Sequence, residues 1–309
     1  MFYVLILVPL MFSCNEQDTA ISGSTEPGYP YTIDFEKGLN NKSEITLSSI
    51  ADSITYIRLD REMKVPLGRC FVLHVTDDEV FVSAPGDESF LYRYNFKGEL
   101  LNSIGKVGRG PGEYLSARFS VNEESQTIVA FCILTDQYLI YKYDGTYIGK
   151  LPVDKENCEG IYTTHYLSDS TFLNILFFAG YKSSMPERFP LFRIFDNKDI
   201  TLFTYPHPIN REIDNIKDDF RMFVTSSYCI RNGDYYNLFF GNSDSVFTVC
   251  GDTAFLSYLF DKGKYTPSEE YKYNHLVSGR VEGDYPEYLL DASGLVERRN
   301  RVYIAQTLG

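Results

Sequence analysis

Hydrophobic and polar residues alternate in short runs along most of this chain, and turn residues separate the runs. Four segments repeat one phrase of strand, tight turn and strand: FLYRYNFKGELLNSIG from Phe90, YLIYKYDGTYIGKL from Tyr138, LFRIFDNKDITLF from Leu191 and SVFTVCGDTAFLSYLF from Ser245. Alternation with a period of two, bounded by turn residues, predicts β-hairpins. The turn residues expected to accept a positive φ are Gly98, Gly145, Asn197 and Gly251.

Two further strands precede each hairpin. The nearer one is DDEVFVS from Asp77, SQTIVAFC from Ser125, DSTFLNILFF from Asp169 and NGDYYNLFF from Asn232. The earlier one is clearest in RCFVLHV from Arg69 and GIYTTHYL from Gly160. Four strands in about fifty residues, repeated, are typical of a propeller blade. The sequence therefore predicts an all-β β-propeller with four complete blades and part of a fifth, which begins in GLVERRNRVYIAQTLG.

The loop SIGKVGRGPGEY, residues 103–114, stands between two of these repeats. The outermost strand of one blade must cross to the innermost strand of the next, and Gly105 to Gly112 are expected to make that crossing because glycine permits unusual turns. In this interpretation Arg109 and Glu113 pair or satisfy backbone groups, and Tyr114 fills the seam between blades. The alternative is functional: Arg109, Glu113, Tyr114 and Arg118 are then ligand-binding candidates on the loop face of the propeller.

Composition narrows the class of partner. The 309 residues carry a formal net charge of −13, with 25 Tyr, 23 Phe and no Trp. An acidic chain does not suit a nucleic-acid partner, which needs clustered cations. Aromatic side chains can stack on sugar rings, but in an all-β fold they mostly fill cores and the seams between sheets. The aromatic excess therefore does not favour a glycan over a peptide as the ligand.

Catalytic motifs are absent from the sequence. It has no G-x-S-x-G, no H-E-x-x-H and no phosphate-binding loop, so we assign no catalytic residue and no cofactor. His74 and His165 fall on expected innermost strands, where a propeller can collect metal ligands, and are the only metal candidates; ordinary polar strand positions explain them as well. A non-enzymatic role is favoured, and a propeller hydrolase or lyase with a metal or acid/base site in the central channel is the alternative.

The N-terminal segment MFYVLILVPLMFSC has an apolar run that is too short to span a bilayer and suits a signal peptide. Ser13 followed by Cys14 resembles the lipobox of bacterial lipoproteins, which implies cleavage before Cys14 and lipidation of its thiol. We therefore expect a signal peptide over residues 1–13, a lipidated tether over 14–42 and a propeller domain over 43–309. A buried N-terminal strand is the alternative. The remaining cysteines form no C-x-x-C pair and are expected to be free thiols.

Taken together, the lipobox, ITYIRLD at residues 54–60 and the G-R-G-P-G-E-Y loop resemble the six-bladed β-propeller lipoproteins of Bacteroidetes, with NHL-like joints between blades. The resemblance implies that ITYIRLD pairs with the last blade to close the ring. It also implies an outer-membrane lipoprotein, facing the periplasm or the cell surface, that binds a glycan, peptide or partner protein. Because the residues from Arg69 onward suffice for nearly five blades, the chain is expected to be shortened at its C-terminus.

Overall fold

The computed structural model describes residues 3–6, 30–40, 46, 48, 53–60, 70–153, 160–176, 178–181, 183, 190–206, 221–224, 227–240, 244–266, 289–298 and 301–308. The chain divides into two compact units. The first contains Met1–Ser22, Ser43–Asp154 and Thr164–Asp169, and the second contains Gly23–Lys42, Lys155–Thr163 and Ser170–Gly309.

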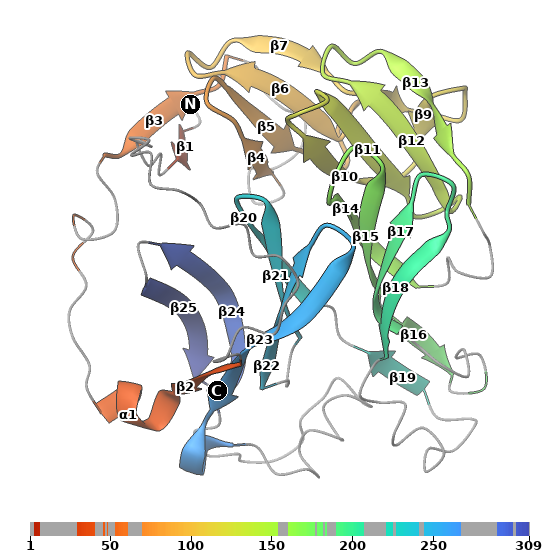
Figure 1. The fold of residues 1–309 in the computed structure, drawn as a ribbon. Coiled ribbons are helices and arrows are strands. Elements are labelled where there is room, and N and C mark those ends of the chain that lie inside the picture. The colour runs from red at the N-terminus through yellow and green to blue at the C-terminus, as the bar shows by residue number, and fades with distance from the viewer. Residues whose placement is uncertain are drawn as a thin grey trace. The chain divides into compact units, whose positions relative to one another are not determined.

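Four sheets account for most of the strands, and each contains an antiparallel meander of four strands in which chain order is kept (Figure 1). The first sheet consists of β4 (Phe71–Val75), β5 (Glu79–Ser83), β6 (Leu91–Asn95) and β7 (Leu100–Ser103), and the second of β10 (Ala117–Asn122), β11 (Thr127–Cys132), β12 (Gln137–Lys142) and β13 (Tyr147–Leu151). The third consists of β14 (Ile161–Tyr166), β15 (Thr171–Leu176), β17 (Pro190–Asp196) and β18 (Thr201–Pro206). The meander of the fourth consists of β20 (Ser227–Asn232), β21 (Tyr235–Phe240), β22 (Ser245–Cys250) and β23 (Thr253–Asp261). The prediction of an all-β fold made of propeller blades is confirmed.

The hairpin turns confirm three of the four predicted positive-φ residues. Gly98 and Gly145 both have φ of 85°, and Gly251 has 59°. The prediction for Asn197 is wrong, because Asp199 takes this conformation in the third sheet, with φ of 64°. Its backbone N–H donates to the carbonyl of Asp196 at 3.0 Å, as Gly98 and Gly145 do to the carbonyls three residues before them.

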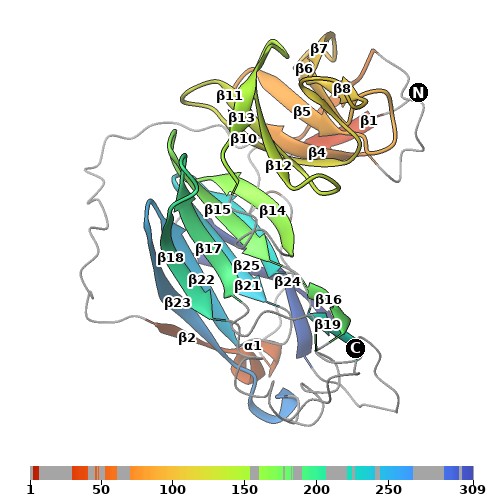
Figure 2. The ribbon, with the colours of Figure 1, turned by 90° about the vertical axis from the view of Figure 1, so that its right-hand side faces the viewer.

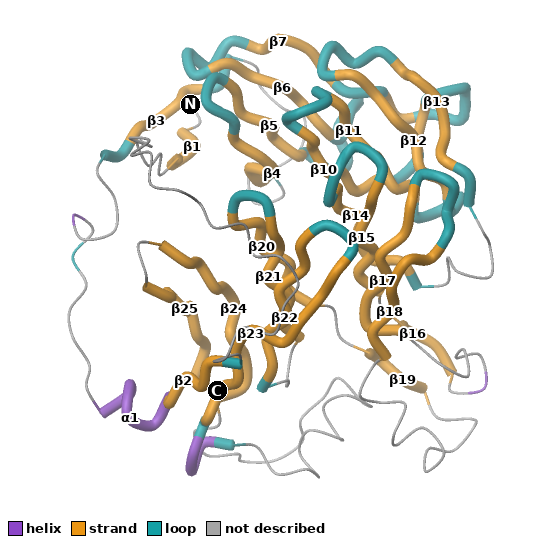
Figure 3. Tube along the Cα trace, in the orientation of Figure 1, coloured by secondary structure: helices purple, strands orange, loops and turns teal. Residues whose placement is uncertain are grey.

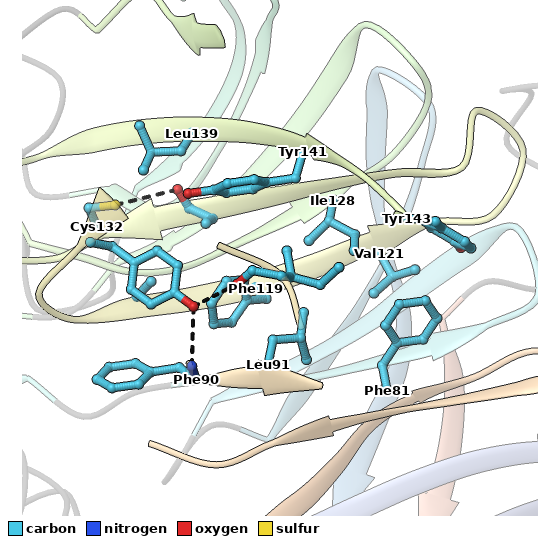
Figure 4. Packing of buried hydrophobic residues seen from close by; sticks show 14 residues of the cluster. Phe81, Phe90, Leu91, Phe119, Val121, Ile128, Cys132, Leu139, Tyr141 and Tyr143 are labelled. Carbon is cyan, nitrogen blue, oxygen red and sulfur yellow. Dashed lines mark hydrogen bonds between the residues drawn. The ribbon is translucent and has the colours of Figure 1, made fainter. Parts of the chain in front are cut away.

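The first two sheets of the first unit share one core, drawn in Figure 4. Phe81, Phe90 and Leu91 of the first sheet lie opposite Phe119 and Val121 of the second. All five side chains are at most 9% exposed. Because neighbouring blades bury each other's apolar faces, this seam is the main stabilising contact between them.

The segment ITYIRLD contains β3 (Thr55–Arg58), which packs on the first sheet. Ile57 is 2% exposed, and the N–H of Asp60 donates to the carbonyl of Gly98 at 2.9 Å. β3 pairs antiparallel with β1 (Tyr3–Ile6) and with no other strand that the structure describes. The implied pairing with a last blade is therefore not what the described strands show, since the strand that pairs with β3 is β1.

The second unit begins with β2 (Tyr31–Asp34), which extends the fourth sheet by pairing in parallel with β23 (Figure 2). The helix α1 (Phe35–Asn40) follows, and the Asp34 carboxylate accepts the backbone N–H of Lys37 at 2.8 Å, as a helix N-cap does. Phe35 is buried against Phe260, with ring centroids 5.0 Å apart. Part of the segment for which the sequence favours a tether thus forms ordered structure on a blade.

A two-stranded sheet joins a loop of the third sheet to the segment that leads into the fourth sheet. β16 (Phe178–Tyr181) pairs antiparallel with β19 (Arg221–Val224), so the loop within the third sheet and the connection to the fourth are joined. Near the C-terminus, β24 (Leu289–Arg298) and β25 (Arg301–Leu308) form an antiparallel hairpin, shown in Figure 3, where a partial fifth blade was predicted. In the part of the chain that is described, no helix is long and apolar enough to span a bilayer.

Candidate functional site

Strand direction brings several irregular loops of the first unit to one end. Strands of a meander alternate in direction, so the loops after the second and fourth strands leave each sheet at the same end. In the first unit these are residues 84–90, 104–116 and 133–136, which we call the crossing-loop end. Two backbone bonds connect them, from Val107 N–H to the Glu88 carbonyl at 2.9 Å and from Ile133 N–H to the Ser116 carbonyl at 3.2 Å.

Residues 104–116 form the crossing loop that joins β7 to β10, as the sequence predicts. Within it β8 (Lys106–Val107) pairs in parallel with β9 (Glu113–Tyr114), so the loop folds back on itself. The Gly108 N–H donates to the Tyr114 carbonyl at 3.0 Å and closes the fold. Gly112 has φ of 70° and packs on the Tyr147 ring so closely that a side chain at Gly112 would strike it.

Tyr114 occupies the seam between the first two sheets, which confirms the structural interpretation of this residue. It is 2% exposed, and its ring lies 5.5 Å from that of Phe90 and 5.4 Å from that of Phe119. Its hydroxyl donates to the Ile104 carbonyl at 2.7 Å and accepts the Phe90 N–H at 3.1 Å. Burial raises the pKa of Tyr114 to about 12. A ring enclosed in this way fixes the loop to both blades.

Glu113 turns inward and binds its own loop. Its Oε2 accepts the Gly110 N–H at 2.7 Å, and its Oε1 lies 2.9 Å from Lys106 Nζ. The bond from Gly110 and then the pairing with Lys106 hold the pKa of Glu113 below its usual range. The ion-pair partner of Glu113 is thus Lys106 and not the Arg109 guanidinium. The expectation that Glu113 satisfies a backbone group is confirmed by its bond from Gly110.

The remaining candidates are placed differently. Arg109 is exposed at the tip of the loop, whereas Arg118 is half-buried on β10, opposite Phe131 in the strand register. The structure therefore gathers Arg109, Glu113 and Tyr114 in one loop and leaves Arg118 on a strand. Sequence reasoning missed Lys106, although a lysine seven residues before a glutamate in so glycine-rich a loop offers a nearby countercharge.

The two histidines proposed as metal candidates have ordinary surroundings. His74 Nε2 lies 2.8 Å from Glu123 Oε1, and its ring centroid is 6.2 Å from that of Phe81. Burial lowers the pKa of His165 to about 4. Among the residues that the structure places, no three His, Cys, Asp or Glu side chains gather as a metal site would require.

Cys70, Cys132, Cys229 and Cys250 are free thiols, as the sequence predicts. Burial raises the pKa of Cys132 to about 11, so this thiol behaves as a small apolar side chain. Cys14 and Cys158 lie outside the described residues.

These features define a protein built of four-stranded propeller blades. Residues 30–304 match the family DUF4934, a domain of unknown function, and the chain belongs to this family. The match begins one residue before β2, so it includes β2 and α1 in the family domain. No curated protein matches the sequence.

Solved structures extend the comparison at low identity. A candidate exported protein from Bacteroides fragilis aligns with 90% of this chain and 74% of its own, with 16% identity and a TM-score of 0.61. A member of the DUF4221 family from Bacteroides vulgatus aligns with 64% of this chain and 59% of its own, with 12% identity and a TM-score of 0.45. A Pyrococcus horikoshii acylaminoacyl peptidase covers 77% of this chain and 43% of its own, with a TM-score of 0.39. The Bacteroides fragilis protein thus shares the fold of this chain.

Proposed function

We propose that this chain is an envelope-anchored lipoprotein of the kind formed by six-bladed propeller lipoproteins of Bacteroidetes, and that it acts as a binding or scaffolding module for a glycan, peptide or partner protein. The crossing-loop end carries the proposal. Its loop is fixed to two blades by the buried Tyr114, while the side chains of Lys106 and Arg109 project into solvent. Rigid support beneath exposed charged loops is the usual construction of a binding site.

A peptide and glycan array tests this role. The wild-type protein is compared with two double variants, each made in the same chain. Lys106→Ala/Arg109→Ala removes two cations of the crossing loop, and Lys97→Ala/Lys142→Ala removes two exposed cations outside the crossing-loop end. We expect the first variant to lose about tenfold or more in affinity for the bound array members, since two charges leave the site. The control variant should bind as the wild type does. Equal binding by all three proteins would place recognition elsewhere, and an array without any bound member would count against a binding role.

The anchor is proposed from the N-terminal sequence. Residues 3–6 form β1 beside β3, in line with the alternative of an N-terminal strand, and residues 7–29 lie outside the described residues. The prediction of a signal peptide, of lipidation at Cys14 and of an outer-membrane location therefore rests on the resemblance to a lipobox. The Bacteroides fragilis protein of similar fold, described as a candidate for export, is consistent with passage into the envelope. The lipid would be the contact with the membrane, and the blades would face the periplasm or the cell surface.

Cells grown with labelled palmitate should incorporate the label into this protein through Cys14. Cys14→Ala should abolish the label and release the protein into the soluble fraction, because one thiol carries the anchor. Cys70→Ala, which removes a thiol within the blades, is the control and should stay labelled. Label retained in Cys14→Ala would exclude lipidation at this residue.

A further inference from the structure

The Glu113 carboxylate is bound as a ligand would be. Its Oε2 accepts the Gly110 N–H at 2.7 Å, and its Oε1 contacts Lys106 Nζ at 2.9 Å. A backbone N–H and an ammonium group that converge on one carboxylate bind it through charge-assisted hydrogen bonds. The crossing loop therefore contains a carboxylate receptor whose present occupant is its own side chain.

Two glycines keep this receptor open. A Cβ at Gly108 would clash with Oε2 of Glu113, and one at Gly110 would stand 3.0 Å from its Cδ. Neither glycine has a positive φ, unlike Gly105 and Gly112 in the same loop. The backbone conformation thus does not require glycine at these two positions, whereas a side chain at either one would have to displace the Glu113 carboxylate from its present place.

The receptor faces solvent and is flanked by groups that the internal carboxylate does not use. The Glu113 side chain is 21% exposed and that of Lys106 is 72% exposed. Among the residues that the structure describes, the exposed Arg109 guanidinium takes part in no ion pair. Val107 and Leu134, both at the crossing-loop end, are 40% and 67% exposed. Arg109 and Val107 place a cation and an apolar side chain in the same loop as the carboxylate, and this combination matches an acidic peptide segment better than a sugar, whose surface is mostly hydroxyl.

We propose that the crossing loop is a receptor for a carboxylate on an acidic peptide segment with apolar neighbours, and that Glu113 occupies the receptor until the peptide displaces it. The proposal rests on the binding function above and names its ligand class. When the peptide carboxylate replaces that of Glu113, Gly110 and Lys106 keep the same number of bonds to a carboxylate, and the Glu113 side chain is hydrated instead. Glu113 acts as an internal competitor with an effective concentration of about millimolar or higher.

Amide NMR spectra of the full chain test the exchange. The probe is a terminally blocked tripeptide with glutamate between valine and leucine, and the same peptide with glutamine is its neutral counterpart. In Glu113→Ala the Gly110 amide signal should move downfield at about a tenfold lower peptide concentration than in the wild type, because the internal competitor is gone. Adding Lys106→Ala should weaken binding by about tenfold. Glu124→Ala, which removes an exposed acid from the β10–β11 turn, should behave as the wild type.

Several outcomes overturn the proposal. A folded Glu113→Ala protein whose Gly110 signal ignores the glutamate peptide excludes the receptor, and an equal response to the glutamine peptide excludes recognition of the carboxylate. A response to a galacturonic acid trisaccharide but not to the peptide would overturn the choice of peptide.

If Glu113→Ala does not fold, the variant to use is Glu113→Gln, which keeps an acceptor for Gly110 without the charge. It should still bind the peptide more tightly than the wild type, and equal affinity would exclude self-competition. A peptide that shifts only distant amides leaves the binding function standing and removes this site.

Discussion

Arg193→Met should destabilise the protein by about 3–5 kcal/mol, because it would leave a buried carboxylate without its cation. Arg193 is 2% exposed on β17. Its Nη1 donates to Asp199 Oδ1 at 2.7 Å, its Nη2 donates to the Asp199 carbonyl at 2.6 Å, and its Nε donates to Thr201 Oγ1 at 2.7 Å. The guanidinium also lies 4.8 Å from the ring centroid of Phe195. Urea unfolding followed by near-ultraviolet circular dichroism measures the loss.

The matched variant is Arg193→Met/Asp199→Gly. It removes both charges and gives the turn the glycine that the other three sheets have at the positive-φ position, Gly98, Gly145 and Gly251. The double variant should therefore regain most of the lost stability and remain within about 1 kcal/mol of the wild type. If Arg193→Met alone stays within that range, the buried pair does not hold this turn.

Tyr114→Ala should cost about 3–5 kcal/mol, since it opens a cavity in the seam between the first two sheets and removes the hydroxyl bonds to Ile104 and Phe90. Tyr114→Phe keeps the ring and leaves the Phe90 N–H without this acceptor, so its cost should be about 1–3 kcal/mol. Chemical unfolding of the two variants separates the contribution of the ring from that of the hydroxyl.

Tyr56→Ala provides the control for this comparison. Tyr56 is 64% exposed on β3, so its removal should change the free energy of unfolding by less than about 0.5 kcal/mol. Equal losses in Tyr114→Ala and Tyr114→Phe would show that the hydroxyl bonds, and not the ring packing, hold the crossing loop to the blades.

The blades could be predicted from the sequence because the patterns that identify them, alternating residues and turn glycines, lie within short segments of the chain. Alternating residues such as those of β11 and β12 are adjacent in the chain, and a glycine at the turn reports its own backbone conformation. The turn of the third sheet was misassigned because Asp199, and not Asn197, takes the positive φ, and Arg193 on β17 binds both its carboxylate and its carbonyl there. That interaction forms only in the folded hairpin, and the turn propensities of Asn197 and Asp199 do not encode it.

The candidate site likewise has features that the sequence determined and features that only the tertiary structure decided. The sequence alone determined that residues 103–114 form a glycine-rich crossing between blades and that Tyr114 suits the seam. The tertiary structure decided that Glu113 binds Lys106 and the Gly110 N–H, because the parallel pairing of β8 with β9 sets which side chains of the loop meet. It also decided that β2 joins β23, whose residues lie more than two hundred positions away. A four-residue strand carries no signal for a partner at that distance, and the pairing arises only when the fourth sheet offers an open edge.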